Sequence, residues 1–207
     1  EDWVAAYDDS PLDDQVGADY AALRYYTSGT TGRPKAIVRK EGTFGAEAGA
    51  AIMEIYGRDF AVENKADNSP VTEADQAAEV IIVAALRELT PHIPVVAEEE
   101  VSAGHQPTVG AGPFWLVDPL DGTREFISRN GDFTVNIALI RGGDPVLGTV
   151  YVPAREETYT AAGPGQVSRR RGTGPVEAIG ARIAAGDGLV AMVSRSHASP
   201  ETDDYLA

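Results

Sequence analysis

Apolar residues recur at helical spacing in two stretches of the chain. Over residues 44–56 they stand three and four positions apart and Gly57 follows them, so the pattern predicts an amphipathic helix that ends near Tyr56. A second helix is predicted from Thr72, whose hydroxyl is typical of an N-cap, to about Leu89. Its apolar face consists of Ala78, Ile81, Ile82, Ala85 and Leu89. We predict a loop over the intervening residues 61–71.

Beyond residue 92 the pattern becomes that of β-strands. Residues 133–140 alternate with a period of two, and shorter apolar runs also predict strands, at 93–97, 114–117, 146–152, 157–161 and 188–193. Residues 163–175 are rich in Gly, Pro and Arg and indicate an exposed loop, while Ser199-Pro200-Glu201 is a typical helix start. Two helices followed by a meander of strands predict an α+β fold, in which helices pack on one side of an antiparallel sheet.

The composition permits a buried core and narrows the class of partner. Of the 207 residues, 43% are hydrophobic and 24% are charged, which is typical of a globular domain. The formal net charge of −15 argues against nucleic-acid binding, although a bound divalent metal would still allow a small anionic ligand. The absence of Cys excludes disulfides, thiolate metal sites and a Cys nucleophile. We find no long apolar run and no signal peptide, and therefore predict a cytoplasmic protein without a membrane span.

Four acidic residues follow apolar segments in a way that allows them to converge: Asp75, Glu98, Asp118 and Asp121. Glu98 directly follows the run 95–97 and Asp118 follows 115–117, and the end of a strand is a rigid place from which to aim a ligand. Two carboxylates about 5 Å apart repel by roughly 3 kcal/mol at an effective dielectric constant of about 20, so a convergent set favours a bound divalent cation. Oxygen ligands alone favour Mg²⁺ or Mn²⁺ over Zn²⁺.

Each of these positions also has a purely structural interpretation. Asp75 stands three residues after Thr72, as the acid of a capping box does. Residues 98–100 are consistent with a solvated acidic run, and Asp118-Pro119 and Asp121-Gly122 are common turn dipeptides. The residues alone leave both interpretations open.

Three motifs, in order and with natural spacing, resemble the lithium-sensitive, magnesium-dependent phosphatase superfamily. It includes inositol monophosphatases and 3′(2′),5′-bisphosphate nucleotidases. The motifs are 65–75 (KADNSPVTEAD), 96–99 (VAEE) and 115–126 (WLVDPLDGTREF). Arg124-Glu125-Phe126 is similar to the bacterial nucleotidase branch, whereas inositol monophosphatases usually carry Thr-Asn-Phe there. Residues 128–137 and 194–197 also resemble this branch, so the resemblance covers about residues 45–207.

The resemblance implies a magnesium centre of two or three ions. Glu98, Asp118 and Asp121 would be metal ligands, with the Leu120 carbonyl as a further ligand and Asp75 completing the shell of metal and water. Mn²⁺ would also fit, and Li⁺ would inhibit. The superfamily has a later Trp-Asp motif that supplies one more ligand, and no Trp follows Trp115 here. We therefore expect the inositol-monophosphatase-like N-terminal lobe with a truncated C-terminal lobe, and turnover that is lowered or lost.

The resemblance also implies how the substrate would be held. Thr123 and Glu98 would orient the attacking water, the N–H groups of Gly122 and Thr123 would hold the phosphate, and Ser194 and His197 would touch the nucleotide. The implied substrate is a small phosphorylated nucleotide, adenosine 3′,5′-bisphosphate, which would be converted to AMP and phosphate.

A second motif lies near the start of the chain, at 26–35 (YTSGTTGRPK). A loop of hydroxyls, glycines and Lys between predicted strands at 23–26 and 36–39 can cradle the phosphates of ATP. The loop resembles the phosphate loop of the adenylate-forming acyl-CoA synthetases, over residues 1–41 only. The resemblance implies an ATP-phosphate loop of Thr27, Ser28, Gly29, Thr30, Thr31, Gly32 and Lys35.

We therefore predict two segments. Residues 1–42 form a synthetase-like appendage, or an inert one, and residues 43–207 form the C-terminally truncated phosphatase domain. The predicted function is that of a metal-dependent 3′(2′),5′-bisphosphate nucleotidase. The alternatives are an inositol monophosphatase-like phosphatase, an ATP-binding synthetase fragment and a metal-binding remnant without hydrolysis.

Overall fold

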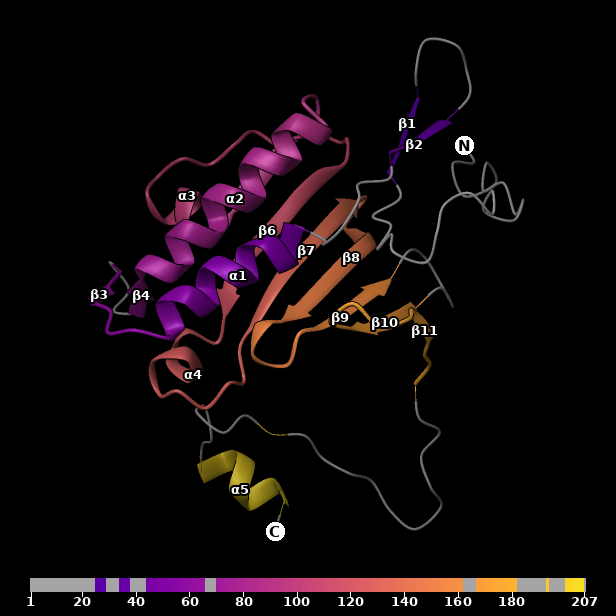
Figure 1. Ribbon diagram of the computed structural model, residues 1–207. Helices are drawn as coiled ribbons and strands as arrows, with labels where there is room; N and C mark the ends of the chain where they lie inside the picture. The colour runs from indigo at the N-terminus through magenta and orange to yellow at the C-terminus, as the bar shows by residue number, and fades with distance from the viewer. Residues whose placement is uncertain are drawn as a thin grey trace.

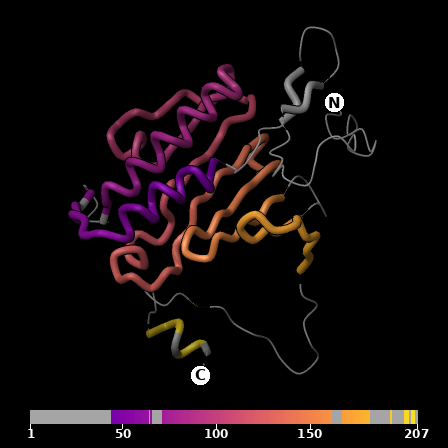
Figure 2. The backbone as a smooth tube through the Cα atoms, viewed as in Figure 1, coloured from indigo at the N-terminus to yellow at the C-terminus, as the bar shows by residue number. Residues whose placement is uncertain are grey.

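Two long helices cover one face of a seven-stranded sheet (Figure 1). The computed structural model describes residues 25–28, 34–37, 44–65, 70–161, 167–181, 193 and 200–206, and Figure 2 follows the path of the backbone through them. The order across the sheet is β11-β10-β9-β8-β7-β6-β5. The strands are β5 (Val95–Ala97), β6 (Phe114–Asp121), β7 (Thr134–Arg141), β8 (Asp144–Val152), β9 (Glu157–Ala161), β10 (Val167–Arg171) and β11 (Glu177–Ala178).

The sheet is antiparallel except at one edge, where β5 runs parallel to β6. The prediction of an antiparallel sheet is therefore wrong for this pair. Between the two strands the chain passes through the short helix α3 (Glu98–Ser102) and a loop, and a crossover of that length returns a strand in the parallel direction. Ala97 lies opposite Val117, so Glu98, which follows β5, and Asp118, with which β6 continues, lie at the same end of this strand pair.

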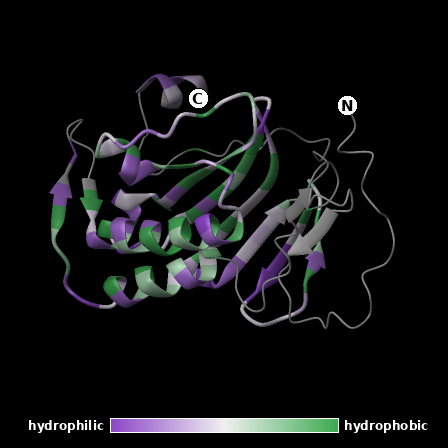
Figure 3. Cartoon of the chain, turned by 90° about the horizontal axis from the view of Figure 1, so that it is seen from above, coloured by the Kyte–Doolittle hydropathy of each residue, from purple (hydrophilic) through white to green (hydrophobic). Residues whose placement is uncertain are grey.

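Both long helices lie where the apolar periodicity places them. Helix α1 (Phe44–Tyr56) packs against β7 and β8, and helix α2 (Glu73–Leu89) packs against β5 and β6. Figure 3 shows the same layer of helices from above, with each residue coloured by its hydropathy. Gly49 allows α1 to approach β8 closely, because a Cβ at this position would collide with the ring of Tyr151.

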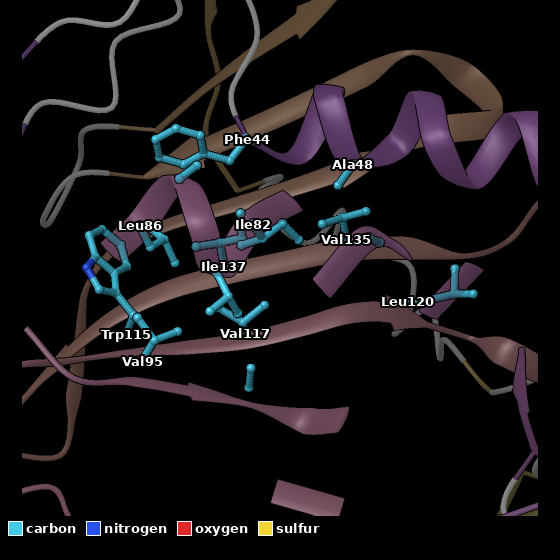
Figure 4. Packing of buried hydrophobic residues seen from close by; sticks show 14 of the residues in the cluster. Phe44, Ala48, Ile82, Leu86, Val95, Trp115, Val117, Leu120, Val135 and Ile137 are labelled. Carbon is cyan, nitrogen blue, oxygen red and sulfur yellow. The ribbon is translucent and has the colours of Figure 1, made fainter. Parts of the chain in front are cut away.

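The core lies between the two helices and the sheet. Alternate residues of β7 point towards the helices and are buried: Val135, Ile137 and Leu139. In Figure 4 the side chains of Ile82 and Leu86 from α2 lie close to Val117 and Ile137 of the sheet. Trp115 is fully buried, and its indole Nε1 donates to Thr90 Oγ1 at 2.9 Å.

Several short elements differ from the prediction. The loop expected at 61–71 contains the strand pair β3 (Val62–Asn64) and β4 (Pro70–Thr72), and the loop expected at 163–175 contains β10. The apolar alternation that marks other strands is missing from β10, whose arginines instead pair across the sheet. Arg169 bonds to Glu177 in β11, and Arg171 bonds to Glu157 in β9.

The remaining elements are short helices and a separate hairpin. The short helices are α4 (Thr123–Ile127), the 3₁₀ helix η1 (Pro153–Arg155) and α5 (Pro200–Leu206). Helix α5 begins at the predicted position. Near the N-terminus, β1 (Tyr25–Ser28) pairs antiparallel with β2 (Pro34–Ile37), about two residues closer to the intervening loop than predicted. The strand predicted at 188–193 lies outside the described residues apart from Val193, which belongs to no element. In the part of the chain that is described, none of the helices has the length and apolar character needed to traverse a bilayer.

Candidate active site

Two carboxylates meet where β5 and β6 end. Glu98 is the first residue of α3, and its carboxyl lies against that of Asp118 near the end of β6. The pKa of Asp118 is raised to about 7, first by burial and then by the charges of Glu98 and Asp121. The bond from the Leu120 N–H to Asp118 Oδ1, 3.2 Å long, opposes this shift. Negative charge is therefore concentrated at one end of the sheet.

A bulge in β6 brings Asp121 to the same place. In a regular strand, residues three apart point to opposite faces. Here Asp118 pairs with Asn136 and Asp121 pairs with Thr134, so three residues of β6 span the same distance as two of β7. A bulge of this kind re-aims the side chains beyond it. Pro119, which has no N–H to donate to the ladder, lies inside the bulge.

Asn136 fixes the orientation of Asp121. Its Nδ2 donates to Asp121 Oδ2 at 3.1 Å, and its Oδ1 accepts from Thr134 Oγ1 at 3.1 Å. The threonine hydroxyl therefore determines which way the amide faces. The Asp118–Thr123 segment that the sequence suggested as a turn is thus a bulged strand as far as Asp121, followed by a turn at Gly122.

Gly122 turns the chain from β6 into α4. Its φ of 95° lies in the left-handed region, and a Cβ there would stand 3.0 Å from the Asp132 carbonyl oxygen. Helix α4 is anchored by Phe126, which is fully buried in an aromatic cluster with Tyr56, Phe60 and Phe133. Because this cluster also contacts α1, the position of Thr123 at the start of α4 is fixed by the core.

Asp75 has both of the roles that the sequence left open. It is the acid of a capping box at the start of α2, since its Oδ2 accepts from the Thr72 N–H at 2.7 Å and the Thr72 hydroxyl at 2.8 Å. Its Oδ1 accepts from the Thr123 hydroxyl at 3.2 Å. That hydroxyl also lies 3.3 Å from the Leu120 carbonyl oxygen. Burial raises the pKa of Asp75, and its hydrogen bonds oppose the shift.

Lys65 begins the motif 65–75 and lies in the site, although the sequence alone predicted no role for it. Its Nζ lies 2.6 Å from Glu98 Oε1 and 2.8 Å from Glu99 Oε1, and its side chain is only 11% exposed. Burial alone would lower the pKa of Lys65, but the bonds to the two glutamates raise it.

Glu79 and Asn136 are two further residues of the site that were not predicted from the sequence. The signal for Glu79 was an acidic residue four positions after Asp75, on the buried face of α2.

The donor chemistry fits a hard divalent cation. Glu98, Asp118 and Asp121 offer only oxygen, and their mutual repulsion is the condition that such a cation relieves. Among the described residues, however, no three acidic or histidine side chains already stand as a ligand group. Glu98 instead pairs with Lys65, and Asp121 is hydrogen-bonded to Asn136.

Two groups of predicted site residues lie partly or wholly outside the described residues. Ser194 and His197 are outside the described residues, so their contact with a nucleotide stays a prediction. In the N-terminal motif the backbones of Thr27 and Ser28 belong to β1 and that of Lys35 to β2, while 29–33 are outside the described residues. Its binding to ATP also stays a prediction.

The chain belongs to the inositol monophosphatase family, whose sequence model matches residues 38–203. More particularly, it is 47% identical over 165 residues to the 3′(2′),5′-bisphosphate nucleotidase CysQ of Escherichia coli K12, an alignment that covers 77% of this chain and 63% of that protein. CysQ of Buchnera aphidicola is 38% identical over 161 residues, covering 77% of this chain and 59% of its own length. The chain thus spans less than two thirds of these relatives.

Solved structures show the same fold. CysQ from Bacteroides thetaiotaomicron, described as a bacterial member of the inositol monophosphatase family, superposes with a TM-score of 0.58 at 36% identity, over 79% of this chain and 64% of that one. The extragenic suppressor protein suhB from Bartonella henselae gives a TM-score of 0.53 at 31% identity, over 62% of this chain and 48% of its own. The expected α+β phosphatase fold is therefore confirmed.

Proposed function

We propose that this chain carries the metal-binding lobe of a Mg²⁺-dependent phosphatase that removes the 3′-phosphate of adenosine 3′,5′-bisphosphate, giving AMP and phosphate. The main support is the contact between the carboxyl groups of Glu98 and Asp118. The nearby charge of Asp121 also raises the pKa of Asp118, so all three carboxylates lie close together. The similarity to CysQ proteins, which are named as 3′(2′),5′-bisphosphate nucleotidases, supports the substrate class. A cytoplasmic site of action is part of the proposal.

Glu98, Asp118 and Asp121 would hold Mg²⁺, with the Leu120 carbonyl as a neutral ligand. The proposal includes two or three ions, Mn²⁺ as a substitute that accepts the same oxygen donors, and Li⁺ as an inhibitor. When bound, Mg²⁺ makes water nucleophilic near neutral pH and offsets the charge that develops on the phosphate and the leaving oxygen.

Thr123 and Asp75 would position the attacking water. The single hydroxyl hydrogen of Thr123 has two acceptors within reach, Asp75 Oδ1 and the Leu120 carbonyl oxygen, and in either case the hydroxyl oxygen is left to accept a bond from the water. Glu98 would orient the same water. The water oxygen attacks phosphorus, the bond from phosphorus to the 3′-oxygen breaks, and that oxygen takes a proton to become the 3′-hydroxyl of AMP. The N–H groups of Gly122 and Thr123 would hold the phosphate oxygens.

Specificity for the nucleotide would come from beyond the phosphate. Ser194 and His197 are proposed to contact it, by their resemblance to the nucleotidase branch. Arg124-Glu125-Phe126 supports the same branch against inositol phosphates.

Phosphate release from adenosine 3′,5′-bisphosphate, compared with myo-inositol 1-phosphate, tests the proposal. With Mg²⁺ we expect release from the nucleotide in preference to the inositol phosphate, suppression by Li⁺ and loss in Asp121→Asn. Asp144→Asn, an exposed position at the start of β8, is the charge-matched control. Preference for the inositol phosphate would overturn the substrate. No release from either compound, with Mg²⁺ still bound, would make the chain a metal-binding lobe without turnover.

We also propose that the N-terminal hairpin is an ATP-phosphate loop of the acyl-CoA synthetase type. The pairing of β1 with β2, with Thr27 opposite Lys35, supports the strand–loop–strand arrangement that such a loop requires. Titration with ATP tests this role, and Lys35→Ala should weaken binding while Lys40→Ala should not. Equal binding by all three proteins, or none, would leave the hairpin an inert appendage.

A further inference from the structure

A buried glutamate on α2 caps a helix that lies elsewhere in the fold. Glu79 stands in the apolar stripe of α2 and is only 5% exposed. Its Oε2 accepts from the Glu99 N–H at 2.7 Å, and its Oε1 accepts from the Glu100 N–H at 2.8 Å. Both N–H groups belong to the first turn of α3 and are not bonded within that helix. The two oxygens of one side chain therefore serve two backbone donors.

Helix α3 has no local substitute for this cap. Its own N-cap is Ala97, whose side chain offers no oxygen, and the helix is five residues long. Its first turn also carries three adjacent acidic residues, 98–100. The carboxylate of Glu79 is the fourth in this region. Its position is unfavourable unless its bonds to the two N–H groups outweigh the repulsion by the other three carboxylates. Its presence at this buried position therefore needs a reason beyond the packing of α2.

The cap determines where Glu98 stands. Glu98 immediately precedes the two residues that Glu79 holds, and it immediately follows β5, whose Ala97 is fixed opposite Val117 of β6. The Glu98 backbone is thus held from both sides. Its carboxyl lies against Asp118 and accepts from Lys65 at 2.6 Å. Without the cap, the first turn of α3 would be held on this side only through side chains, by the ion pairs of Glu99 with Lys65 and of Glu100 with Arg87.

We propose that Glu79 is a positioning residue of the metal site: by capping α3 it keeps Glu98 within reach of Asp118 and of the cation that the two would share. This inference rests on the proposed function only in that it needs a divalent cation at this site. It does not need turnover. Replacing a residue that holds a metal ligand in place typically lowers the affinity for the metal by roughly ten- to a hundredfold.

Mg²⁺ binding measured by calorimetry tests the inference in Glu79→Gln, which keeps the shape of the side chain but only one of its two acceptor oxygens. We expect the Mg²⁺ dissociation constant to rise by about tenfold or more. If the protein turns over, the Mg²⁺ concentration for half-maximal activity should rise in parallel, with a smaller change in the rate at saturating Mg²⁺. Glu79→Asp should show a smaller loss, and it carries the test if the glutamine variant does not fold. Glu88→Gln, an exposed change of the same kind on α2, should bind as the parent chain does.

The outcomes separate this inference from the proposed function. A lower melting temperature in Glu79→Gln with unchanged Mg²⁺ affinity would show a merely structural cap and overturn the positioning role. Reduced Mg²⁺ affinity in a chain that releases no phosphate would support the positioning role while the nucleotidase function fails. A parent chain that binds no Mg²⁺ would overturn both.

Discussion

The Thr123 hydroxyl donates to Asp75 Oδ1 at 3.2 Å and so joins the start of α4 to the start of α2 across 48 residues of sequence. The other oxygen of Asp75 caps α2 through Thr72. One carboxylate therefore fixes a helix N-terminus and orients a hydroxyl of the candidate active site. Because Asp75 is buried, neither partner can be exchanged for water without cost.

Asp75→Asn should separate these two roles. The amide oxygen can still accept from Thr72 while the NH₂ group faces the Thr123 hydroxyl and cannot accept its hydrogen. We expect phosphate release to fall by about a hundredfold or more, with a much smaller change in the urea midpoint. Glu73→Gln removes the same charge from the first turn of α2 at an exposed position and should keep its activity. An Asn variant as active as the parent would show that Asp75 is only a cap.

The helices and most strands were predictable because local patterns determine them. The spacing of apolar residues placed α1 and α2, and the strict alternation after Phe133 placed β7. The direction of β5 was not predictable in this way, because it depends on a crossover and on pairing with a strand about twenty residues away. β10 was missed because its sequence ends in three arginines, two of which pair with glutamates of the neighbouring strands, and such residues show no apolar alternation.

In the site, the sequence identified the acidic residues but not what holds them. Asp118 and Asp121 were identified by their motif, whereas the bulge that brings their charges together appears only in the register between β6 and β7. Asn136 and Glu79 act through hydrogen bonds to residues 15 and 20 or more positions away. A single sequence contains no periodicity that reports such contacts.

Gly122→Ala should cost more stability than the left-handed φ alone explains. Gly104 has a similar φ of 87°, and a Cβ added there would meet nothing within 4 Å, so Gly104→Ala isolates the backbone term of about 1–2 kcal/mol. At Gly122 the added Cβ would also press on the Asp132 carbonyl oxygen at 3.0 Å and on Phe133 at 3.3 Å. Urea unfolding of the two variants should therefore show the larger loss for Gly122→Ala. Equal losses would mean that the turn relaxes around the new methyl group.

Thr90→Val should destabilise the core through a hydrogen bond rather than through volume. Thr90 is fully buried, accepts from the Trp115 indole and donates to the Leu86 carbonyl at 3.0 Å. Valine removes the hydroxyl that accepts from the indole N–H, and the loss of such a buried bond costs about 1–3 kcal/mol. Trp115→Phe in the valine background removes that donor, so the double-mutant cycle should show a coupling energy between the two positions. Strictly additive losses in urea unfolding would contradict the role of the bond.

The pH dependence of stability should reveal the charge at the candidate metal site. Without metal the pKa of Asp118 is raised to about 7 by burial and by the charges of Glu98 and Asp121, so between about pH 4 and pH 7 the folded state holds a proton that the unfolded state has released. The contribution of Asp118 to stability is therefore present at low pH and is lost as the pH rises through this window.

Melting temperatures in EDTA should fall more steeply with pH for the parent and for Asp144→Asn than for Asp118→Asn. Millimolar Mg²⁺ should flatten the parent curve, because a bound cation offsets the charge that deprotonation creates. A parent curve that matches Asp118→Asn in EDTA would show that the three carboxylates do not share one site.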